Sequence, residues 1–308
     1  MGLLVDGKWQ DRWYNTEEHG GKFVRDKARF RDEIKKGTRF EPERDRYHLF
    51  VSYACPWAHR TLIYRELKGL QDIIPVTVVH PHMLENGWEL RDDKGNSIDP
   101  LYGFNFLYEL YIKAQSDYSG RVTVPVLWDK KEETIVNNES GEIIRFLNHA
   151  FDEITGNHGD FYPRQLRVEI DDWNEMIYRK VNNGVYRCGF ATTQEAYEEA
   201  FTALFETLDR LDYRLTSQPF LFGKEPVETD WRLFTTLIRF DAVYFGHFKA
   251  NRRRITEYPA LSAYVARLYA HPGVAKTVHF DHIKQHYYFS HKHINPSQIV
   301  PLGPERFF

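Results

Sequence analysis

One of the two cysteines, Cys55, stands where a strand-like run gives way to a helix-like run. The run from Tyr47 to Val51 is typical of a strand, and Pro56, directly after the cysteine, suits the first turn of a helix. Apolar residues then recur at helical spacing until Gly69. Because the N–H groups at a helix N-terminus favour a thiolate over a thiol, we expect Cys55 to be a nucleophile.

The residue three positions later decides how such a thiol is used. A cysteine with the ordinary pKa of about 8.5 is about 3% thiolate at pH 7, whereas a pKa near 6 gives about 90%. Ala58 occupies the place of the second cysteine of a dithiol motif, so no local thiol can resolve a mixed disulfide. The alternative interpretation is a small buried core cysteine, and the agreement of strand, proline and helix argues against it.

The segments around Cys55 alternate between strand and helix and predict an α/β, thioredoxin-like domain. Pro75 has no N–H group, which places the second strand at an edge of the sheet. Val124-Pro125 lies where thioredoxin-like folds keep a cis peptide bond facing the thiol. The expected strands are 47–51, 74–79, 122–128 and 134–136, and the expected helices are 57–69, 105–114 and 140–150.

After a linker-like segment at 156–163, every pattern is helical, which predicts an all-α second domain. Leu166, Ile170, Trp173 and Ile177 show the spacing of one helix face, and later segments repeat it. We expect four parts: an N-terminal extension at 1–46 that packs on the core, a thioredoxin-like domain at 47–152, an all-helical substrate domain at 164–290, and a C-terminal tail at 291–308. The long polar loop at 80–102 is of a length that is often functional.

Composition excludes several classes of protein. The 308 residues are 42% hydrophobic and 28% charged, with a net charge of −3, so neither nucleic acid nor an anionic membrane is an expected partner. No signal pattern, membrane-length apolar run, phosphate loop or serine nucleophile elbow is present. Two distant cysteines, Cys55 and Cys188, fit a reducing compartment, and we expect a cytoplasmic protein. The sequence alone does not decide whether these two cysteines form a disulfide.

Several longer motifs identify a family resemblance that covers nearly the whole chain. The sequence resembles the Xi class of glutathione transferases, the glutathionyl-hydroquinone reductases. The matching motifs are SYACPWAHRT (52–61), MLENGW (83–88), GRVTVPVLWD (120–129), NES (138–140) and NNGVY (182–186), with GKF (21–23), RFDAVY (239–244) and INP (294–296) outside them. One departure is Val227, where many transferases begin a core helix with a capping Ser or Thr, and it concerns folding stability.

The resemblance implies roles for four catalytic residues. Cys55 would be the nucleophile, Tyr186 the proton donor and acceptor, and Tyr244 and Tyr287 hydroxyls near the sulfur that lower its pKa. Phenols can hydrogen-bond a thiolate, and another phenol can protonate the substrate as the carbon–sulfur bond breaks. Without the resemblance, each tyrosine would be read as a packing residue with a polar tip.

The resemblance also implies a glutathione site. Glutathione would be held by Trp88, by the segment Arg121, Val122, Thr123 and Val124, and by Glu139 and Ser140. Glu139 and Ser140 open a helix, where the free N–H groups suit a carboxylate, although ordinary helix capping explains them equally well. The family implies a homodimer and no metal; His282 and His286 have a zinc-like spacing, but the family match accounts for their run better.

The implied activity is reduction of a glutathionyl-hydroquinone through a Cys55–glutathione disulfide, with glutathione as the co-substrate. The enzyme rival is an omega-like thioltransferase or dehydroascorbate reductase, which shares the cysteine but does not need the three tyrosines. The rival from another class is a non-catalytic ligand-binding protein of the same fold, in which Cys55 would be unreactive.

Overall fold

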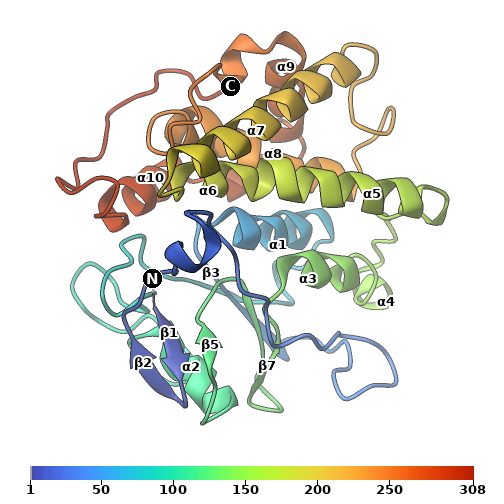
Figure 1. Cartoon of the computed structure of the whole chain (residues 1–308). Coiled ribbons are helices and arrows are strands. Elements are labelled where there is room, and N and C mark those ends of the chain that lie inside the picture. Colours follow the sequence, from blue (N-terminus) through green and yellow to red (C-terminus); the bar gives the residue numbers. More distant parts are fainter. Residues whose placement is uncertain (1) are drawn as a thin grey trace. The chain divides into compact units, whose positions relative to one another are not determined.

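The computed structural model describes residues 2–308, which form two compact units (Figure 1). Unit 1 comprises the residues up to Trp13, Asp26–Gly159 and Lys276–His286. Unit 2 comprises Tyr14–Arg25, Asp160–Ala275 and Tyr287–Phe308. These units are discontinuous along the chain, whereas the predicted domains 47–152 and 164–290 are continuous, and the limits of those domains stay a proposal.

Unit 1 contains the expected thioredoxin-like sheet. Its four strands lie in the order β4-β3-β6-β7, with β3 parallel to β4 and antiparallel to β6, which in turn is antiparallel to β7. The strand bounds are β3 Tyr47–Val51, β4 Val76–Val78, β6 Val126–Asp129 and β7 Thr134–Asn137. β4 lies at the edge of the sheet, as Pro75 predicted, and the Val124-Pro125 peptide bond is cis.

Two predictions about the strands were wrong. The expected strand at 122–128 begins only at Val126, because Pro125 has no N–H group for a ladder hydrogen bond. No strand was expected in the N-terminal extension, but β1 (Leu3–Val5) and β2 (Lys8–Gln10) form a hairpin there, and β1 also pairs with β5 (Gly120–Arg121). Asp6 and Gly7 both have positive φ, so the Asp-Gly pair was a hairpin signal that the sequence reading missed.

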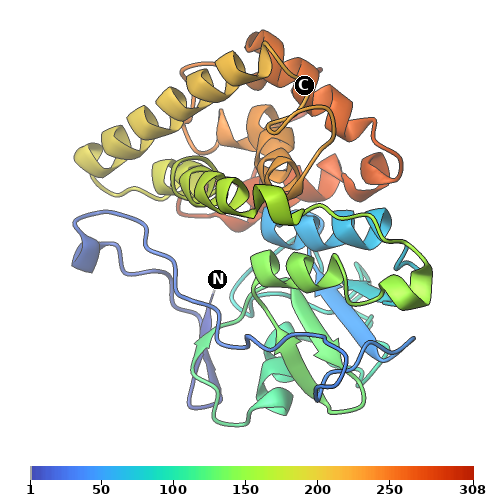
Figure 2. The same cartoon turned by 90° about the vertical axis from the view of Figure 1, so that its right-hand side faces the viewer.

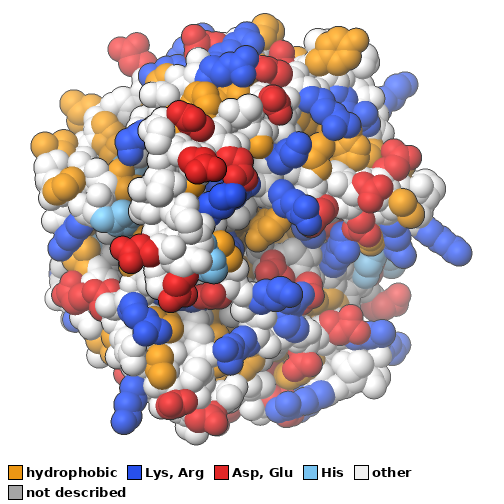
Figure 3. Space-filling model, viewed as in Figure 1, with side chains coloured by type: hydrophobic (Ala, Val, Ile, Leu, Met, Phe, Trp, Pro, Cys, Tyr) orange, Lys and Arg blue, Asp and Glu red, His pale blue; other side chains and the backbone are white. Residues whose placement is uncertain are grey.

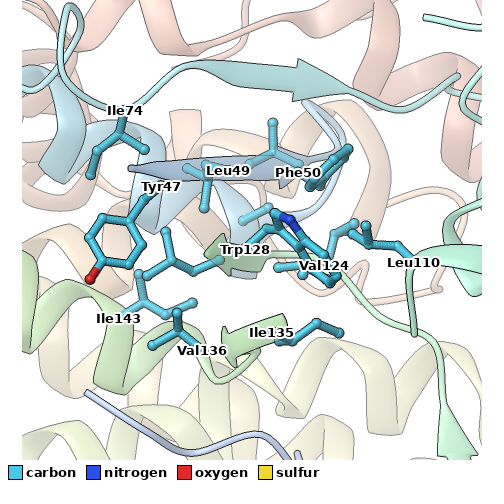
Figure 4. Close-up of a cluster of buried hydrophobic side chains, with 14 of the residues drawn as sticks. Tyr47, Leu49, Phe50, Ile74, Leu110, Val124, Trp128, Ile135, Val136 and Ile143 are labelled. Carbon is cyan, nitrogen blue, oxygen red and sulfur yellow. The ribbon is translucent and has the colours of Figure 1, made fainter. Parts of the chain in front are cut away.

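Helices cover both faces of the unit 1 sheet. α1 (Pro56–Leu67) and α3 (Ser140–Leu147) lie side by side on one face, and α2 (Leu107–Ala114) packs near β7 on the other (Figures 1 and 2). All five residues of β3 are buried, as expected for a central strand covered on both sides. Figure 4 shows this core, in which Leu49 and Phe50 of β3 and Trp128 of β6 lie among side chains from the neighbouring strands and helices. Two shorter helices, α4 (Asp152–Thr155) and α10 (Phe280–Lys284), complete the unit.

Unit 2 is helical, as predicted. Its helices are α5 (Arg167–Ile177), α6 (Gly184–Gly189), α7 (Gln194–Leu215), α8 (Glu228–Arg239) and α9 (Pro259–Tyr269). Wider π-helical turns follow α5 at Tyr178–Asn182 and α8 at Phe240–Tyr244, and a third spans Gln285–Phe289. Such turns often occur at functional sites because they change the direction of the side chains that follow.

The surface mixes charges of both signs. On the face shown in Figure 3, Lys and Arg side chains are interspersed with Asp and Glu side chains, in keeping with the net charge of −3. Within residues 2–308, none of the helices is both long and apolar enough to span a membrane.

A buried histidine in unit 1 predicts a local response to acid. His48 lies in β3, its Nε2 is 2.7 Å from the Thr77 hydroxyl, and burial lowers its pKa to about 4. Since this folded-state pKa lies below the ordinary 6.5, the group contributes stability above pH 6.5 that is lost as the pH falls through 4. We expect about 3 kcal/mol less protection in hydrogen exchange of the β3 amides at pH 4 than at pH 7.

The control for this prediction is His48→Gln, which can still hydrogen-bond to Thr77 but cannot take up a proton. Its exchange protection should depend less on pH over the same range. An equal pH dependence in the variant and in the unchanged chain would show that His48 is not the group responsible.

Candidate active site

The Cys55 thiol is the N-cap of α1. Cys55 has an extended backbone conformation (φ −75°, ψ 121°), and Pro56 begins the helix. The sulfur accepts a hydrogen bond from the Ala58 N–H at 3.5 Å, and it lies 3.6 Å from the Val124 carbonyl oxygen. The side chain is half-buried. A sulfur that accepts from the first turn of a helix is placed where a negative charge is stabilised.

A second helix begins at the same end of the sheet, where β3 and β7 finish. Because β3 and β7 are both antiparallel to β6, they run in the same direction, and the helices that follow them start at the same end. Glu139 is the N-cap of α3, and its Oε1 accepts from the Gly141 N–H at 3.1 Å. The buried Arg60 of α1 donates to the Ser140 hydroxyl at 3.4 Å. Unit 1 therefore presents two helix N-termini and a buried cation near each other, which suits an anionic ligand.

The other residues predicted to bind glutathione have structural contacts of their own. Trp88 is buried, and its ring stacks on His286 at 4.8 Å between centroids. Thr123 is fixed by Tyr111, whose hydroxyl donates to the Thr123 carbonyl at 2.8 Å. Val122 and Val124 are buried. The Arg121 guanidinium donates to the carbonyls of residues 12 and 13 and pairs with Asp26, so its charge is directed toward the N-terminal extension.

Unit 2 brings the three predicted tyrosines together. The Tyr287 hydroxyl lies 2.5 Å from the Tyr186 hydroxyl and 3.0 Å from the Tyr244 hydroxyl, so Tyr287 is the centre of a hydrogen-bonded chain. Burial, and then the neighbouring Tyr186 and Tyr244, raise the pKa of Tyr287 well above its usual value. Tyr287 therefore stays protonated and links the two other hydroxyls.

Burial distinguishes the two ends of this chain. Tyr244 is 0% exposed, Tyr287 2% and Tyr186 8%, so Tyr186 is the most accessible member. If Tyr244 donates to Tyr287 and Tyr287 donates to Tyr186, the Tyr186 proton points out of the chain. Tyr244 and Tyr287 both lie in π-helical turns, which the spacing of apolar residues could not reveal.

The sequence reading missed two arginines. Arg60 was seen only as part of a motif, and its burial against Ser140 and the Trp57 ring depends on how α1 packs on α3. Arg25 lies in the N-terminal extension, and its guanidinium carbon is 5.0 Å from the centroid of the Tyr186 ring. No motif or spacing relates Arg25 to Tyr186, which is 161 positions further along the chain.

Two of the histidines near the end of the chain, His279 and His286, contact other protein groups. The His279 ring stacks on Tyr53 at 3.6 Å between centroids, and His286 Nδ1 lies 2.9 Å from the Pro81 carbonyl oxygen. In the described part of the chain, no three His, Cys, Asp or Glu side chains are grouped so that they could hold a metal ion. Cys188 is buried, burial raises the pKa of its thiol to about 12, and within residues 2–308 neither cysteine forms a disulfide.

Comparison with known proteins decides the family. Residues 54–150 match the glutathione S-transferase N-terminal domain, and residues 194–267 match the C-terminal domain. The chain is 53% identical to the glutathionyl-hydroquinone reductase PcpF of Sphingobium chlorophenolicum, over 99% of this chain and 96% of PcpF. It is also 53% identical to the glutathionyl-hydroquinone reductase YqjG of Escherichia coli, over 99% and 95% of the two chains. The chain belongs to the Xi-class glutathione transferases.

Solved structures of Xi-class and related transferases agree with this assignment. The glutathione-bound structure of Escherichia coli YqjG has a TM-score of 0.90 and 50% identity, and the match covers 99% of this chain and 96% of that one. The Xi-class transferase of Phanerochaete chrysosporium also has a TM-score of 0.90 and 50% identity, with 93% and 99% covered. The predicted family and fold, an α/β thioredoxin-like domain with an all-α domain, are confirmed.

Proposed function

We propose that this Xi-class transferase reduces glutathionyl-hydroquinones to hydroquinones with glutathione, which leaves as oxidised glutathione. The observation that carries the proposal is the Cys55 sulfur at the N-terminus of α1, in a chain 53% identical to two glutathionyl-hydroquinone reductases. Ala58 leaves the motif without a second thiol, which is why the cycle uses two glutathione molecules.

The proposed chemistry starts from the keto tautomer of the substrate, in which a proton has moved onto the ring carbon that carries sulfur. The Cys55 thiolate attacks the glutathionyl sulfur, so a disulfide forms and the carbon–sulfur bond breaks. The electron pair of that bond restores the aromatic ring and leaves an oxyanion on the former carbonyl. A second glutathione thiolate then attacks the Cys55–glutathione disulfide and releases oxidised glutathione.

Tyr186 is the proposed proton donor to this oxyanion. Its hydroxyl ends the chain that starts at Tyr244 and passes through Tyr287, and it is the most accessible of the three. The chain can shift protons toward Tyr186 as its own proton leaves. That Tyr244 and Tyr287 also stabilise the Cys55 thiolate stays a prediction.

The proposed glutathione site lies at the end of the sheet where β3 and β7 finish and α1 and α3 begin. Glu139 and Ser140 at the N-terminus of α3 would take the carboxylate and ammonium of the glutamyl group, with Arg60 supporting Ser140. The extended backbone of Val122, Thr123 and Val124, with Trp88 and Arg121, would complete the site. We also propose that the enzyme is a cytoplasmic homodimer, as the family implies.

The test is a product assay with purified protein, a glutathionyl-hydroquinone and excess glutathione. Equal amounts of hydroquinone and oxidised glutathione are expected. In Tyr186→Phe the rate of hydroquinone release should fall about 10²- to 10³-fold, because the oxyanion loses its proton donor. Exchange of a small glutathione mixed disulfide should change little, since its thiolate leaving group needs no phenol.

The contrary result would point to another transferase activity. A relative from Schizosaccharomyces pombe, 51% identical over 92% of this chain and 94% of its own length, is named glutathione S-transferase omega-like 2. Turnover of small mixed disulfides with no hydroquinone release, or full hydroquinone release in Tyr186→Phe, would overturn the proposed mechanism and favour an omega-like thioltransferase.

A further inference from the structure

Residues 14–25, which we call the strap, leave unit 1 after Trp13 and return to it at Asp26. A single side chain holds both of its ends. The Arg121 guanidinium donates to the Arg12 carbonyl and, at 3.1 Å, to the Trp13 carbonyl, and its Nε lies 3.3 Å from the Asp26 carboxylate. Arg121 is therefore placed to fix where the strap begins and ends.

The middle of the strap is hydrogen-bonded to the residues just before α7. The Thr192 N–H donates to the Gly21 carbonyl at 3.0 Å, and the Thr193 hydroxyl donates to the Gly20 carbonyl at 3.2 Å. Gly21 has φ +82°, and a Cβ there would lie 2.5 Å from the Thr193 side chain. Only glycine fits this position, so the path of the strap across unit 2 is specific.

The end of the strap packs on the aromatic cluster around Tyr186. Phe23 is buried, with its ring centroid 5.2 Å from that of Phe190 and 6.4 Å from that of Tyr186. Two residues later, the Arg25 guanidinium lies 5.0 Å from the Tyr186 ring centroid, and its Nε donates to Asn183 Oδ1 at 3.3 Å. The same guanidinium carbon is 5.2 Å from the Phe23 ring centroid, so the cation lies against both rings and is held there by Asn183 on the turn before α6.

We propose that Arg25 is a positioning residue for Tyr186, which the strap delivers to the face of the Tyr186 ring to hold the ring and to stabilise the phenolate formed when its proton is transferred. A guanidinium over an aromatic ring is attracted to its electron-rich face. The attraction is stronger for a phenolate, whose negative charge spreads into the ring. Arg25 thereby makes Tyr186 a stronger acid without touching the substrate.

The other charged and titratable groups around Tyr186 set the background for this effect. Arg239, buried at the end of α8, favours the phenolate of Tyr287. On α6, directly after Tyr186, the Arg187 guanidinium pairs with Glu199, and Cys188 is a neutral buried thiol. The Tyr244 and Tyr287 rings lie beside the Tyr186 ring, while His291 and His293 contact Phe190 and His247 contacts Phe248. The Arg25 guanidinium lies over the Tyr186 ring itself.

The inference rests on the proposed role of Tyr186 as proton donor. Tyr186 works while protonated, so activity should fall at high pH as its hydroxyl ionises. Because a nearby cation lowers the pKa of a phenol, removing Arg25 should move this alkaline fall of activity to higher pH.

The test compares Arg25→Met, Arg25→Lys and Lys22→Met in the pH profile of hydroquinone release. Arg25→Met should shift the alkaline fall upward by about 1 pH unit and lower the rate at pH 7 about 3- to 10-fold. Arg25→Lys keeps the charge and should keep most of the wild-type profile. Lys22 lies on the same strap and forms an exposed ion pair with Glu199 of α7. Lys22→Met removes this ion pair and should leave the profile unchanged.

Two further measurements separate this inference from the proposed function. The alkylation rate of Cys55 against pH should be equal in all three variants, since Arg25 acts on Tyr186. If the protein releases no hydroquinone, the proposed function fails. Ionisation of Tyr186 is then measured as the difference in tyrosinate absorbance between the protein and its Tyr186→Phe variant across a pH titration. Arg25→Met should again raise the pH midpoint of that ionisation. An unshifted alkaline fall and midpoint in Arg25→Met, or an equal shift in Lys22→Met, would overturn the inference.

Discussion

Replacing Cys55 with serine is expected to lower kcat/KM for glutathionyl-hydroquinone reduction by at least ~10³-fold. A serine hydroxyl at the N-terminus of α1 can still cap the helix, so the fold should be retained. The hydroxyl is hardly ionised at neutral pH and cannot form a disulfide, so the step that breaks the carbon–sulfur bond has no nucleophile. The measurement is hydroquinone release by chromatography, with the unfolding temperature recorded beside it.

A single-turnover experiment identifies the nucleophile directly. Without added glutathione, the unchanged protein should release one hydroquinone per chain and gain one glutathionyl group on Cys55, detected by mass spectrometry of its peptides. Burial keeps the Cys188 thiol protonated, so Cys188 should carry no adduct in the unchanged protein. Cys188→Ala is the matched control and should give the same release of hydroquinone and the same adduct on Cys55. A glutathionyl group on Cys188, or a burst of hydroquinone from Cys55→Ser, would show that the assignment is wrong.

Replacing Asp230 with alanine is expected to destabilise unit 2 by about 4 kcal/mol, which should lower the unfolding temperature by about 10 °C. The fully buried Asp230 carboxylate accepts from the Leu221 and Val227 N–H groups at 2.9 and 2.8 Å and from the Tyr264 hydroxyl at 2.8 Å. Alanine would leave three buried donors without an acceptor. The effect is large because Val227 forms no capping hydrogen bond through its side chain, so the Asp230 carboxylate is the side chain that accepts from the Val227 N–H at the start of α8.

The pH dependence of the same carboxyl has a defined sign. Burial raises the pKa of Asp230 to about 6, above the ordinary 3.8, so the part of its stability contribution that depends on protonation is complete below pH 3.8 and is lost as the pH rises through 6. Acid should therefore lower the stability of unit 1 through His48, whereas protonation of Asp230 should raise the stability of unit 2.

Thermal unfolding followed by circular dichroism measures the effect of Asp230→Ala. The control is Asp171→Ala at an exposed position of α5, where the carboxylate accepts a surface hydrogen bond from the Tyr162 hydroxyl, and this change should cost less than about 1 kcal/mol. Equal losses in both variants would contradict the role of Asp230.

The position of Cys55 was predicted from the sequence because every signal for it is local. Pro56 fixes the backbone at the first turn of α1, the β-forming run before it gives β3, and Pro75 keeps β4 at the edge. The same local reasoning found the Val124-Pro125 cis bond but extended its strand too far, since it gave too little weight to the missing N–H of Pro125. It also passed over the Asp6-Gly7 turn, a local signal that was present and unused.

The relations within the candidate site were decided by tertiary structure. The sequence by itself determined the residue types, the helix that presents Cys55 and, through long motifs, the family. It could not show that Tyr287 links Tyr186 to Tyr244, because residues far apart in the chain meet there and π-helical turns break the regular spacing. Nor could it show that Arg25 lies over Tyr186, since that contact depends on the path of the strap and on packing around Gly21. Local propensities act over a few residues, whereas packing alone brings such distant side chains together.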